Sequence, residues 1–291
     1  MKRVVSVSLG SSRRDHRAEV EFLGQLFVVE RRGVDGKFKA AQALLRELDG
    51  QVDAIGLGGV DIYLRCRDKR YVLRDGKRLL ECVQRTPVAD GSGLKDTLEA
   101  AVVHQLTRHT PLVGKKVLVV SALDRFGLAE ALVQEGAQCT FGDKIFALDL
   151  DQPIHDLETL EREAEKLLPE LCKLPISMLY PVGPSQTRIE PKDLTTRYML
   201  EADWICGDFH LIRRRLPDRL QGKTVLTNTI TAEDVEELRG RGVARLITTT
   251  PEFAGRSFGT NVLEAMLLAA GKSPEELLAL QWEPRVVDLD G

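Results

Sequence analysis

The segment from Val113 to Asp143 has the pattern of a strand–helix–strand unit. Val117 to Val120 form a continuous apolar run, which is typical of a strand buried on both faces in a parallel sheet. After a polar loop, apolar residues at helical spacing end at Gly136, where a helix C-terminus favours glycine. A second strand is expected at Gln138 to Phe141. An acidic residue, Asp143, then follows, as in the nucleotide-binding half of a Rossmann-type sheet.

The loop between this first strand and the helix departs from the G-x-G-x-x-G pattern of dinucleotide-binding folds. Ser121 and Leu123 stand where the first two glycines let the backbone approach a pyrophosphate, and Gly127 remains in register. Arg125 could replace the lost contacts with a charged one. Two interpretations stay open: a loop that still binds a dinucleotide, and a Rossmann-like domain that has lost its nucleotide.

Length and composition indicate a globular protein of two domains. The chain has 291 residues, of which 43% are hydrophobic and 29% charged. A formal net charge of −3 gives no electrostatic case for nucleic acid or acidic membranes. Five dispersed cysteines read as reduced thiols, and neither a signal-peptide core nor a membrane-length apolar run is visible. We therefore expect a cytoplasmic protein with a small-molecule substrate, no nucleic-acid or membrane partner, and a possible homodimer.

The order of expected elements predicts an α/β fold. Residues 1–110 are expected to form an α/β substrate domain, completed by about 257–291, whose helices return to it. Residues 111–256 are expected to form a Rossmann-like, doubly wound parallel sheet. Expected N-terminal elements are strands Arg3–Val7, Ala18–Phe22, Leu26–Glu30 and Val52–Leu57, and helix Lys37–Leu48. Expected strands of the second domain are Val117–Val120, Gln138–Phe141, Ile176–Tyr180, Trp204–Cys206, Thr224–Thr227 and Arg245–Thr248.

Polar residues follow several of these strands. Ligands of open parallel sheets bind at the carboxyl ends of the strands, so such residues are favoured by position. Asn228 ranks first, because its amide can meet a nicotinamide ribose or carboxamide. His16 and His210 are the histidines considered for proton transfer, and no cluster has metal-ligand spacing. Further strand-end candidates are Ser185, Gln186, Thr187, Asp208, Thr229, Thr248 and Thr250. The predicted cofactor-binding residues are Ser121, Leu123, Arg125, Phe126, Gly127, Asp143, Thr227, Asn228 and Thr249.

One stretch resembles a known family. The run Asp90-Gly91-Ser92-Gly93-Leu94, a helix, and then Leu112-Val113-Gly114-Lys115-Lys116-Val117-Leu118-Val119-Val120 is similar to shikimate/quinate dehydrogenases. In that family an N-T-D-x-x-G-F loop and a helix precede a G-K-x-V-L-V strand. The detailed resemblance covers about residues 86–143, and proteins of the quinate 5-dehydrogenase type look most similar. It implies a substrate domain, a cofactor domain and C-terminal helices that return to the first.

The resemblance also implies roles for residues. Asp90 would be the catalytic aspartate that hydrogen-bonds the reacting hydroxyl; alternatively it caps the helix that begins near Leu94. The family's N-V-T-x-P-x-K segment, which supplies its lysine partner, is absent from the likely equivalent stretch, Gly56–Tyr63. Lys69, the nearest lysine downstream, is the candidate for this catalytic lysine. Asp143 would accept hydrogen bonds from the adenine ribose, which favours NAD, with NADP possible. The predicted substrate-binding residues are Ser11, Ser12 and Asn261.

Three functions remain open at this point. The first is an NAD(P)-dependent oxidoreductase that transfers hydride between a nicotinamide cofactor and an alicyclic hydroxy acid such as quinate or shikimate. The second is a non-catalytic ligand-binding or regulatory protein that kept the fold. The third is an enzyme of another chemistry on the same kind of sheet. The first requires Asp90 to face the Ser121–Gly127 loop, and a loop filled by side chains would count against it.

Overall fold

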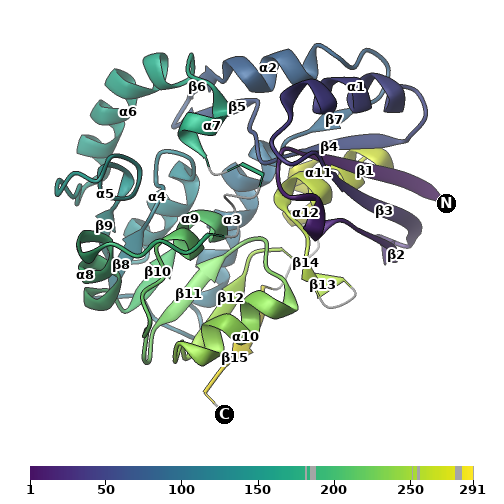
Figure 1. The fold of residues 1–291 in the computed structure, drawn as a ribbon. Helices are drawn as coiled ribbons and strands as arrows, with labels where there is room; N and C mark the ends of the chain where they lie inside the picture. Colours follow the sequence, from purple (N-terminus) through teal and green to yellow (C-terminus); the bar gives the residue numbers. More distant parts are fainter. Residues whose placement is uncertain (181, 184–187, 251, 254–255, 279–283, 291) are drawn as a thin grey trace.

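The computed structural model describes residues 1–180, 182–183, 188–250, 252–253, 256–278 and 284–290. Figure 1 shows two α/β halves side by side, each built on its own sheet. The N-terminal half carries the first sheet, and the middle of the chain carries the second. The expected fold class, α/β with a doubly wound parallel sheet, is confirmed.

The first sheet has the strand order β2-β3-β1-β4-β7. All neighbours are parallel except β2 and β3, which form a hairpin. Leu23 and Gly24 make its turn with positive φ angles of 52° and 70°, the geometry of a two-residue hairpin loop. The strands are β1 (Lys2–Ser8), β2 (His16–Phe22), β3 (Gln25–Gly33), β4 (Ala54–Gly58) and β7 (Val88–Ala89).

The second sheet has the order β15-β12-β11-β10-β8-β9, and only β15 is antiparallel. Alternate residues of β8 belong to different cores: Val117 and Val119 pack with one set of helices, and Leu118 with the other. Helices therefore cover both faces, as a doubly wound sheet requires. The strands are β8 (Lys116–Val119), β9 (Gln138–Phe141), β10 (Trp204–Cys206), β11 (Thr224–Thr227), β12 (Arg245–Thr248) and β15 (Arg285–Asp288).

The helices lie mainly between these strands. In the described part of the chain no helix is long and apolar enough to cross a membrane. The helices are η1 (Ser12–Arg14), α1 (Phe38–Leu48), α2 (Arg74–Leu80), α3 (Ser92–Leu106), α4 (Phe126–Gln134), α5 (Asp143–Leu148), α6 (Leu157–Leu171), α7 (Ile176–Leu179), α8 (Asp193–Glu201), α9 (Phe209–Arg214), α10 (Ala232–Gly240), α11 (Thr260–Ala270) and α12 (Pro274–Leu278).

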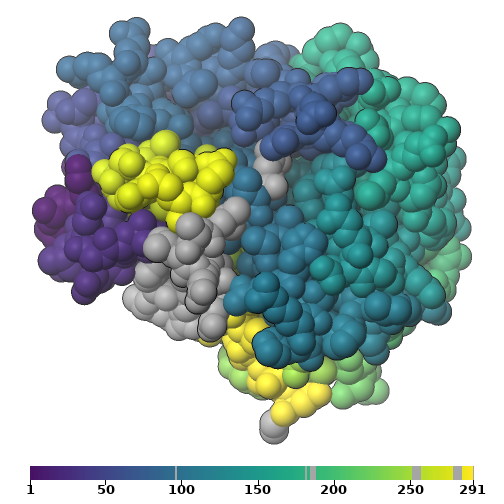
Figure 2. All heavy atoms as spheres, turned by 180° about the vertical axis from the view of Figure 1, so that it is seen from behind, coloured from purple at the N-terminus to yellow at the C-terminus, as the bar shows by residue number. Residues whose placement is uncertain are grey.

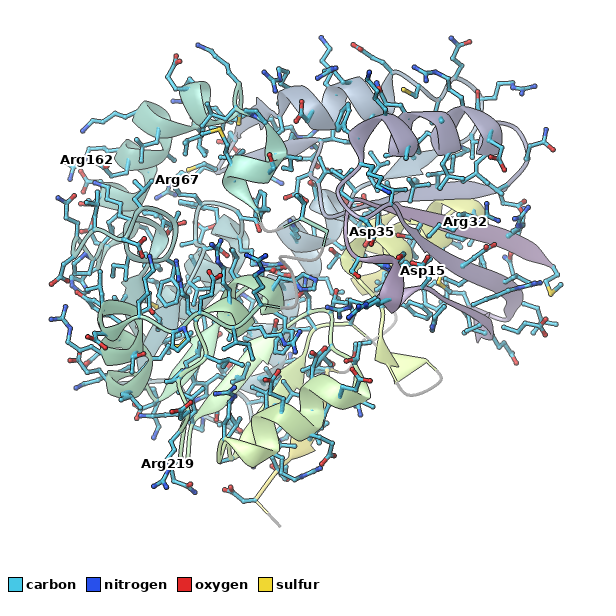
Figure 3. All side chains as sticks on the ribbon, in the orientation of Figure 1. Asp15, Arg32, Asp35, Arg67, Arg162 and Arg219 are labelled. Atoms are coloured by element: carbon cyan, nitrogen blue, oxygen red, sulfur yellow. The ribbon has the colours of Figure 1, made fainter. Side chains whose placement is uncertain are left out.

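Two short hairpins lie outside the main sheets. β13 (Glu252–Phe253) pairs with β14 (Arg256–Ser257), and β5 (Tyr63–Cys66) pairs with β6 (Lys69–Val72). The β5–β6 hairpin reaches toward α6, where Arg67 forms an ion pair with Glu161. Figure 3 shows Arg67 on that side of the molecule, away from the first sheet. This hairpin therefore ties the N-terminal half to a helix of the second half.

Two sequence-based expectations about the fold were wrong. Ile176–Tyr180 was expected to be a strand, but Ile176–Leu179 is a helical turn that follows Pro175. Only Ile176 of this helical turn is buried, and Met178 is exposed, so the short apolar run does not enter a sheet. Residues 257–291 were expected to complete the first domain, yet Arg285–Asp288 forms β15 of the second sheet.

The C-terminal segment thus divides between the halves. α11 packs on β1, β4 and β7, and α12 packs on α3. In the rear view of Figure 2, yellow C-terminal residues lie beside the purple N-terminal part, and a second yellow patch lies at the opposite end. The helices return to the first sheet as expected, whereas the last strand does not.

Gly91 offers a test of how α11 and the start of α3 fit together. Its φ is +92°, and a Cβ there would lie 2.6 Å from the Asn261 backbone nitrogen and against the Thr260 side chain. Gly91→Ala should destabilise the fold by about 1–2 kcal/mol for the left-handed backbone and by about a further 1–3 kcal/mol for overpacking. Gly24→Ala, with a similar φ and open space around it, should show only the first cost. Urea unfolding measures both; equal losses would contradict the close packing.

Candidate functional site

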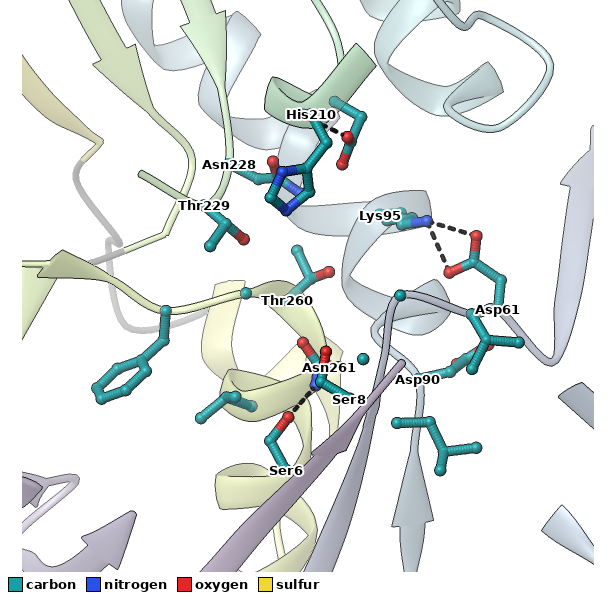
Figure 4. Close-up of a pocket in the computed structure, with 18 of the residues that line it drawn as sticks. Ser6, Ser8, Asp61, Asp90, Lys95, His210, Asn228, Thr229, Thr260 and Asn261 are labelled. Carbon is teal, nitrogen blue, oxygen red and sulfur yellow. Dashed lines mark hydrogen bonds and ion pairs between the residues drawn. The ribbon is translucent and has the colours of Figure 1, made fainter. Parts of the chain in front are cut away.

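A pocket of about 130 Å³ lies where the carboxyl ends of the two parallel sheets meet. From the first sheet it is lined by Ser8 at the end of β1 and Gly58 at the end of β4. From the second it is lined by Asp124, Asp208 and Asn228, which follow β8, β10 and β11. Because β8 lies between β9 and β10, its end is the topological switch point where doubly wound sheets bind ligands. The start of α11 closes the pocket in Figure 4.

Lys95, in the first turns of α3, is the central charge of this pocket. It is only 8% exposed, and its Nζ donates to Asp61 Oδ1 at 2.8 Å, Asp61 Oδ2 at 2.9 Å and Asp124 Oδ1 at 2.9 Å. Asp61 follows β4 of the first sheet and Asp124 follows β8 of the second. A single ammonium group therefore joins the two halves across the pocket.

The two carboxyl partners of Lys95 have very different pKa values. Burial raises the pKa of Asp61 well above its ordinary value, and the nearby carboxylates of Asp124 and Asp90 raise it further, against the effect of Lys95. Burial also acts to raise the pKa of Asp124, but Lys95 and Arg125 outweigh it and hold that pKa at about 2. The protonated form is thus favoured for Asp61, and the ionised form is favoured for Asp124.

Arg125 is buried in the loop after β8, where a phosphate contact was expected. Its exposed fraction is 2%, and its guanidinium forms ion pairs with Glu99, with Asp208 at 3.4 Å and with Asp124 at 3.8 Å. Glu99 belongs to α3, so this ion pair also spans the two halves. Because these carboxylates already neutralise Arg125, its position is explained without a phosphate.

Asp143 binds the same loop from the other side. Its Oδ1 accepts a hydrogen bond from the backbone N–H of Leu123 at 2.9 Å, and its Oδ2 accepts one from Ala122 at 3.2 Å. These are amides of the loop that was expected to approach a pyrophosphate. Phe126 is buried and Gly127 lies in the first turn of α4. The chain's own side chains therefore fill the loop, and as arranged it does not fit a pyrophosphate.

Asp90 lies in the pocket, as the first hypothesis required, but its oxygens are engaged. Its Oδ2 accepts hydrogen bonds from the Ile62 backbone and from Ser92 Oγ at 2.7 Å, and its Oδ1 accepts one from the Ser92 N–H at 3.1 Å. Ser92 begins α3. The alternative interpretation, a carboxylate that stabilises the start of this helix, thus describes its contacts, while its position at the pocket wall remains compatible with a ligand contact.

Lys69 is not part of the pocket, so its predicted catalytic place is wrong. It lies on β6 with 61% of its side chain exposed, in an ion pair with Glu165 of α6. In the resembling family the lysine belongs to the N-V-T-x-P-x-K segment, which is absent here, and Lys69 was chosen as the nearest lysine downstream of Gly56–Tyr63. The pocket lysine is Lys95, which comes later and arrives from α3.

Of the predicted substrate-binding residues, one lines the pocket and two lie outside it. Asn261 lines the pocket and donates from Nδ2 to Ser6 Oγ at 2.9 Å. Ser11 Oγ accepts a hydrogen bond from the Arg13 backbone N–H and caps η1, and Ser12 Oγ donates to Asp35 Oδ2 at 2.9 Å. Asp35 lies beside the first sheet in Figure 3. Ser11 and Ser12 stabilise this turn and lie outside the pocket lining. The prediction that they bind the substrate in this pocket is therefore wrong.

Of the polar residues that follow the later strands, some line the pocket and others do not. Asn228 and Thr229 line the pocket, whereas Thr227 Oγ1 donates to the Gly207 carbonyl at 2.8 Å and Thr249 is buried outside the lining. Ser121 is buried as well, and its Oγ has no hydrogen-bond partner in the described part of the chain. The strand-end candidates Ser185, Gln186 and Thr187 lie outside the described residues.

His210 lines the pocket but is held neutral. Burial and the neighbouring Arg14, whose Nη1 lies 3.3 Å from His210 Nδ1, lower its pKa to about 4 against the effect of Asp208. Asp208 Oδ1 also accepts a hydrogen bond from the backbone N–H of His210 at 2.9 Å and so caps α9. His16 packs edge-on against Phe258 with ring centroids 5.1 Å apart. At neutral pH His210 therefore offers a neutral ring to the pocket.

Sequence reasoning missed Asp61, Lys95 and Asp124. Asp61 follows the glycine-rich end of β4, so the rule that ligands bind at strand ends could have selected it. Asp124 lies in the Ser121–Gly127 loop that was already singled out. No local signal distinguishes Lys95. Among the described residues no group of histidine, cysteine and carboxylate side chains could hold a metal ion.

Comparison with known families places the chain. This two-domain α/β protein matches, over residues 93–289, the family model described as a domain of unknown function, DUF8754, and over residues 3–90 that of DUF8753. Because the first match covers more than half of the chain, the protein belongs to the DUF8754 family. No curated protein matches the sequence significantly.

Solved structures resemble the chain only distantly. Glutamate dehydrogenase from Thermus thermophilus is 13% identical, with 96% of this chain and 71% of that chain covered and a TM-score of 0.42. A galactofuranose binding protein is 11% identical, with 100% and 95% covered and a TM-score of 0.38. A dipicolinate synthase from Bacillus halodurans is 15% identical, with 97% and 98% covered and a TM-score of 0.32. At these low scores none of the three assigns a function.

The environment of Asp143 predicts a pH-dependent stability. Burial raises its pKa to about 6, against its two amide hydrogen bonds. In the unfolded chain the pKa is about 4, so the folded state binds more protons between about pH 4 and about pH 6. The stabilisation from this carboxyl is present at low pH and is lost as pH rises through that window, by at most about 3 kcal/mol.

Asp143→Asn removes this titration. The free energy of unfolding of the wild type minus that of the variant should fall as pH rises from about 4 to about 6. Urea unfolding at a series of pH values measures the difference, and other titrating groups cancel in it. A difference that stays constant or rises with pH would show that the amide hydrogen bonds outweigh burial.

Proposed function

We propose that the protein binds a small, hydroxyl-rich molecule in the pocket between its two sheets. The observation that carries this proposal is the set of neutral polar side chains that face the pocket. Thr260 is 4% exposed, and neither its hydroxyl nor that of Thr229 has a hydrogen-bond partner in the described part of the chain. Asn228 is 5% exposed, and its Nδ2 has no such partner among the described residues either. These atoms are open to the pocket rather than sealed in the core, so the hydroxyl groups of a ligand can pair with them there.

The charges of the pocket favour a ligand with little charge. The cations that line it are already paired: Lys95 with two carboxylates, Arg125 with Glu99 and Asp208, and Arg31 with Asp15. A strongly anionic ligand would have to displace these partners and meet the remaining carboxylates. A cyclic polyol with at most one carboxylate suits the arrangement better. Quinate and shikimate belong to this class, in line with the family resemblance of residues 86–143.

Side chains of the pocket provide the test of this proposal. A panel of quinate, shikimate and simple monosaccharides is added to the purified protein, and thermal unfolding is followed. A ligand at 100 times its dissociation constant should raise stability by about 2.7 kcal/mol. Asn228→Ala and Thr260→Val should each weaken binding about fivefold, the loss of about 1 kcal/mol expected for one hydrogen bond.

A matched control accompanies these variants. Thr196→Val removes a hydroxyl from α8, outside the pocket, and should leave the affinity unchanged. If the pocket variants and Thr196→Val bind the ligand with the same affinity, the ligand binds outside this pocket. If no member of the panel stabilises a well-folded sample, the proposed ligand class is wrong.

A second candidate is an NAD(P)-dependent oxidoreductase that acts on the same class of alicyclic hydroxy acid. The placement of Asp90 and Lys95 on one pocket wall, at the switch point of the second sheet, supports it. The loop after β8 argues against it, because Asp143 and Arg125 occupy the places that a pyrophosphate needs. The non-catalytic binding function therefore has the better support.

The effect of nicotinamide nucleotides on the stability of the wild type and of Asp143→Ala distinguishes the two candidates. If Asp143 binds a cofactor ribose, NAD should stabilise the wild type and the variant should lose this effect. If Asp143 instead closes the loop, none of NAD, NADH, NADP and NADPH should stabilise the wild type. Thermal unfolding of both proteins with each nucleotide measures the result. A wild type stabilised by NAD and a variant that is not would establish a dinucleotide site at this loop and favour the oxidoreductase candidate.

A further inference from the structure

We propose that the start of α11 is a carboxylate-binding subsite of the pocket, which orients the ligand by a single acidic group. The inference rests on the proposed function and deepens it, because it states which end of a hydroxylated ligand lies at which wall. It concerns Thr260, the first residue of α11, and Ser8, the last residue of β1, both of which line the pocket. Neither family match assigns a role to these two residues.

The first observation is the direction of α11. Residues 257–262, which include the start of this helix, line the pocket, so its amino end faces the cavity. The helix has 11 residues, and Gly259 at its N-cap position makes no side-chain cap. Among the described residues, the backbone N–H groups of Thr260 and Asn261 have no hydrogen-bond partner. Such a helix end carries partial positive charge and favours an anion.

The second observation is the Thr260 side chain, which indicates a ligand independently of the helix. This residue is 4% exposed, and its hydroxyl has no hydrogen-bond partner in the part of the chain that the structure describes. Figure 4 shows its side chain in the middle of the pocket, between Thr229 and Asn261. A hydroxyl at this place can donate to the same ligand group that the helix end attracts.

The third observation is that Ser8 can only donate a hydrogen bond to a ligand. Its Oγ accepts hydrogen bonds from Arg31 Nη2 at 2.9 Å and from the Gly10 backbone N–H at 3.1 Å. A hydroxyl oxygen has two lone pairs, so both are occupied and only the proton remains for a ligand. Arg31 itself forms an ion pair with Asp15 at 2.8 Å. A ligand group beside Ser8 must therefore be a hydrogen-bond acceptor.

Ser6 connects Ser8 with the start of α11. It lies two residues before Ser8 on β1, so both side chains point to the same face of the first sheet. Ser6 Oγ accepts a hydrogen bond from Asn261 Nδ2 at 2.9 Å. Figure 4 shows Ser6, Ser8, Asn261 and Thr260 on the α11 side of the cavity. This wall thus combines hydroxyl donors with the amino end of a helix.

The carboxyl groups of the pocket have partners elsewhere. Asp61 and Asp124 accept hydrogen bonds from Lys95, which Figure 4 draws across the cavity from Thr260. The oxygens of Asp90 accept hydrogen bonds from the chain itself. Carboxylates accept hydrogen bonds from ligand hydroxyls and repel an acidic group. A ligand with one carboxylate and several hydroxyls is therefore held in one orientation, with its acidic group at α11.

Acetate and acetamide provide the first test, because they have nearly the same shape and only acetate is charged. Each is titrated into the ¹⁵N-labelled complete chain at constant ionic strength, and the backbone amide signals of Thr260 and Asn261 are followed by NMR. Acetate should shift both signals along a saturating curve, whereas acetamide should leave them in place. Thr260→Val should weaken acetate binding about fivefold, as expected for one lost hydrogen bond. Thr260→Ser keeps the hydroxyl and should bind acetate as the wild type does.

The second test compares shikimate and quinate with their methyl esters, which keep the ring hydroxyls and lose the charge. The wild type should bind the acid more tightly than its ester. Thr260→Val and Ser8→Ala should each lower the ratio of these two affinities about fivefold. Asn228→Ala is the matched control, because it removes an amide that follows β11 from the same pocket. It should weaken the binding of acid and ester equally.

The outcomes separate the subsite from the proposed function. If acetate and acetamide act alike, or if acid and ester bind equally, the carboxylate subsite does not exist, although the pocket can still bind a neutral ligand. Binding of a monosaccharide without binding of either acid has the same meaning. An affinity ratio that Thr260→Val leaves unchanged also overturns the subsite. If acetate binds at Thr260 and no member of the panel stabilises the protein, the proposed ligand class is wrong and the subsite remains.

Discussion

The buried ammonium of Lys95 is the contact on which the arrangement of the two halves depends. A charge at this depth is tolerated only with carboxylate partners, and its partners come from loops that follow strands of different sheets. The Arg125–Glu99 ion pair repeats the same connection beside it. Removing one member of such a buried pair typically costs about 3–5 kcal/mol. The ends of β4 and β8 are therefore fixed relative to each other, and the pocket between them has a defined shape.

The same contacts explain why the loop after β8 differs from a nucleotide-binding loop. In a dinucleotide fold, backbone amides and a helix N-terminus meet a phosphate. Here Asp143 takes two of the amides, and Arg125 turns toward the carboxylates of α3 and of the α9 cap. The internal polar groups satisfy one another. Recognition of a ligand is then left to the neutral side chains at the pocket wall.

Sequence patterns predicted most of the regular structure, because long elements carry strong signals. The strand–helix–strand unit around Val117–Val120 formed as expected. The failures lie in short segments. Ile176–Leu179 carries too few residues to separate a strand from a helical turn. Arg285–Asp288 was assigned to the wrong half, because pairing with β12 is a long-range choice.

The sequence by itself determined the α/β class, the parallel sheet of the second domain and the edge of that sheet at which a ligand would lie. Buried strands read as apolar runs, and the rule that ligands bind at their carboxyl ends selected Asn228. Asp90 and Asn261 came from the family resemblance, and all three residues line the pocket. Tertiary structure alone decided the charged centre. Lys95 meets Asp61 and Asp124 across separations of 34 and 29 residues. Electrostatic partners are chosen by distance in space and by burial, and a linear pattern records neither.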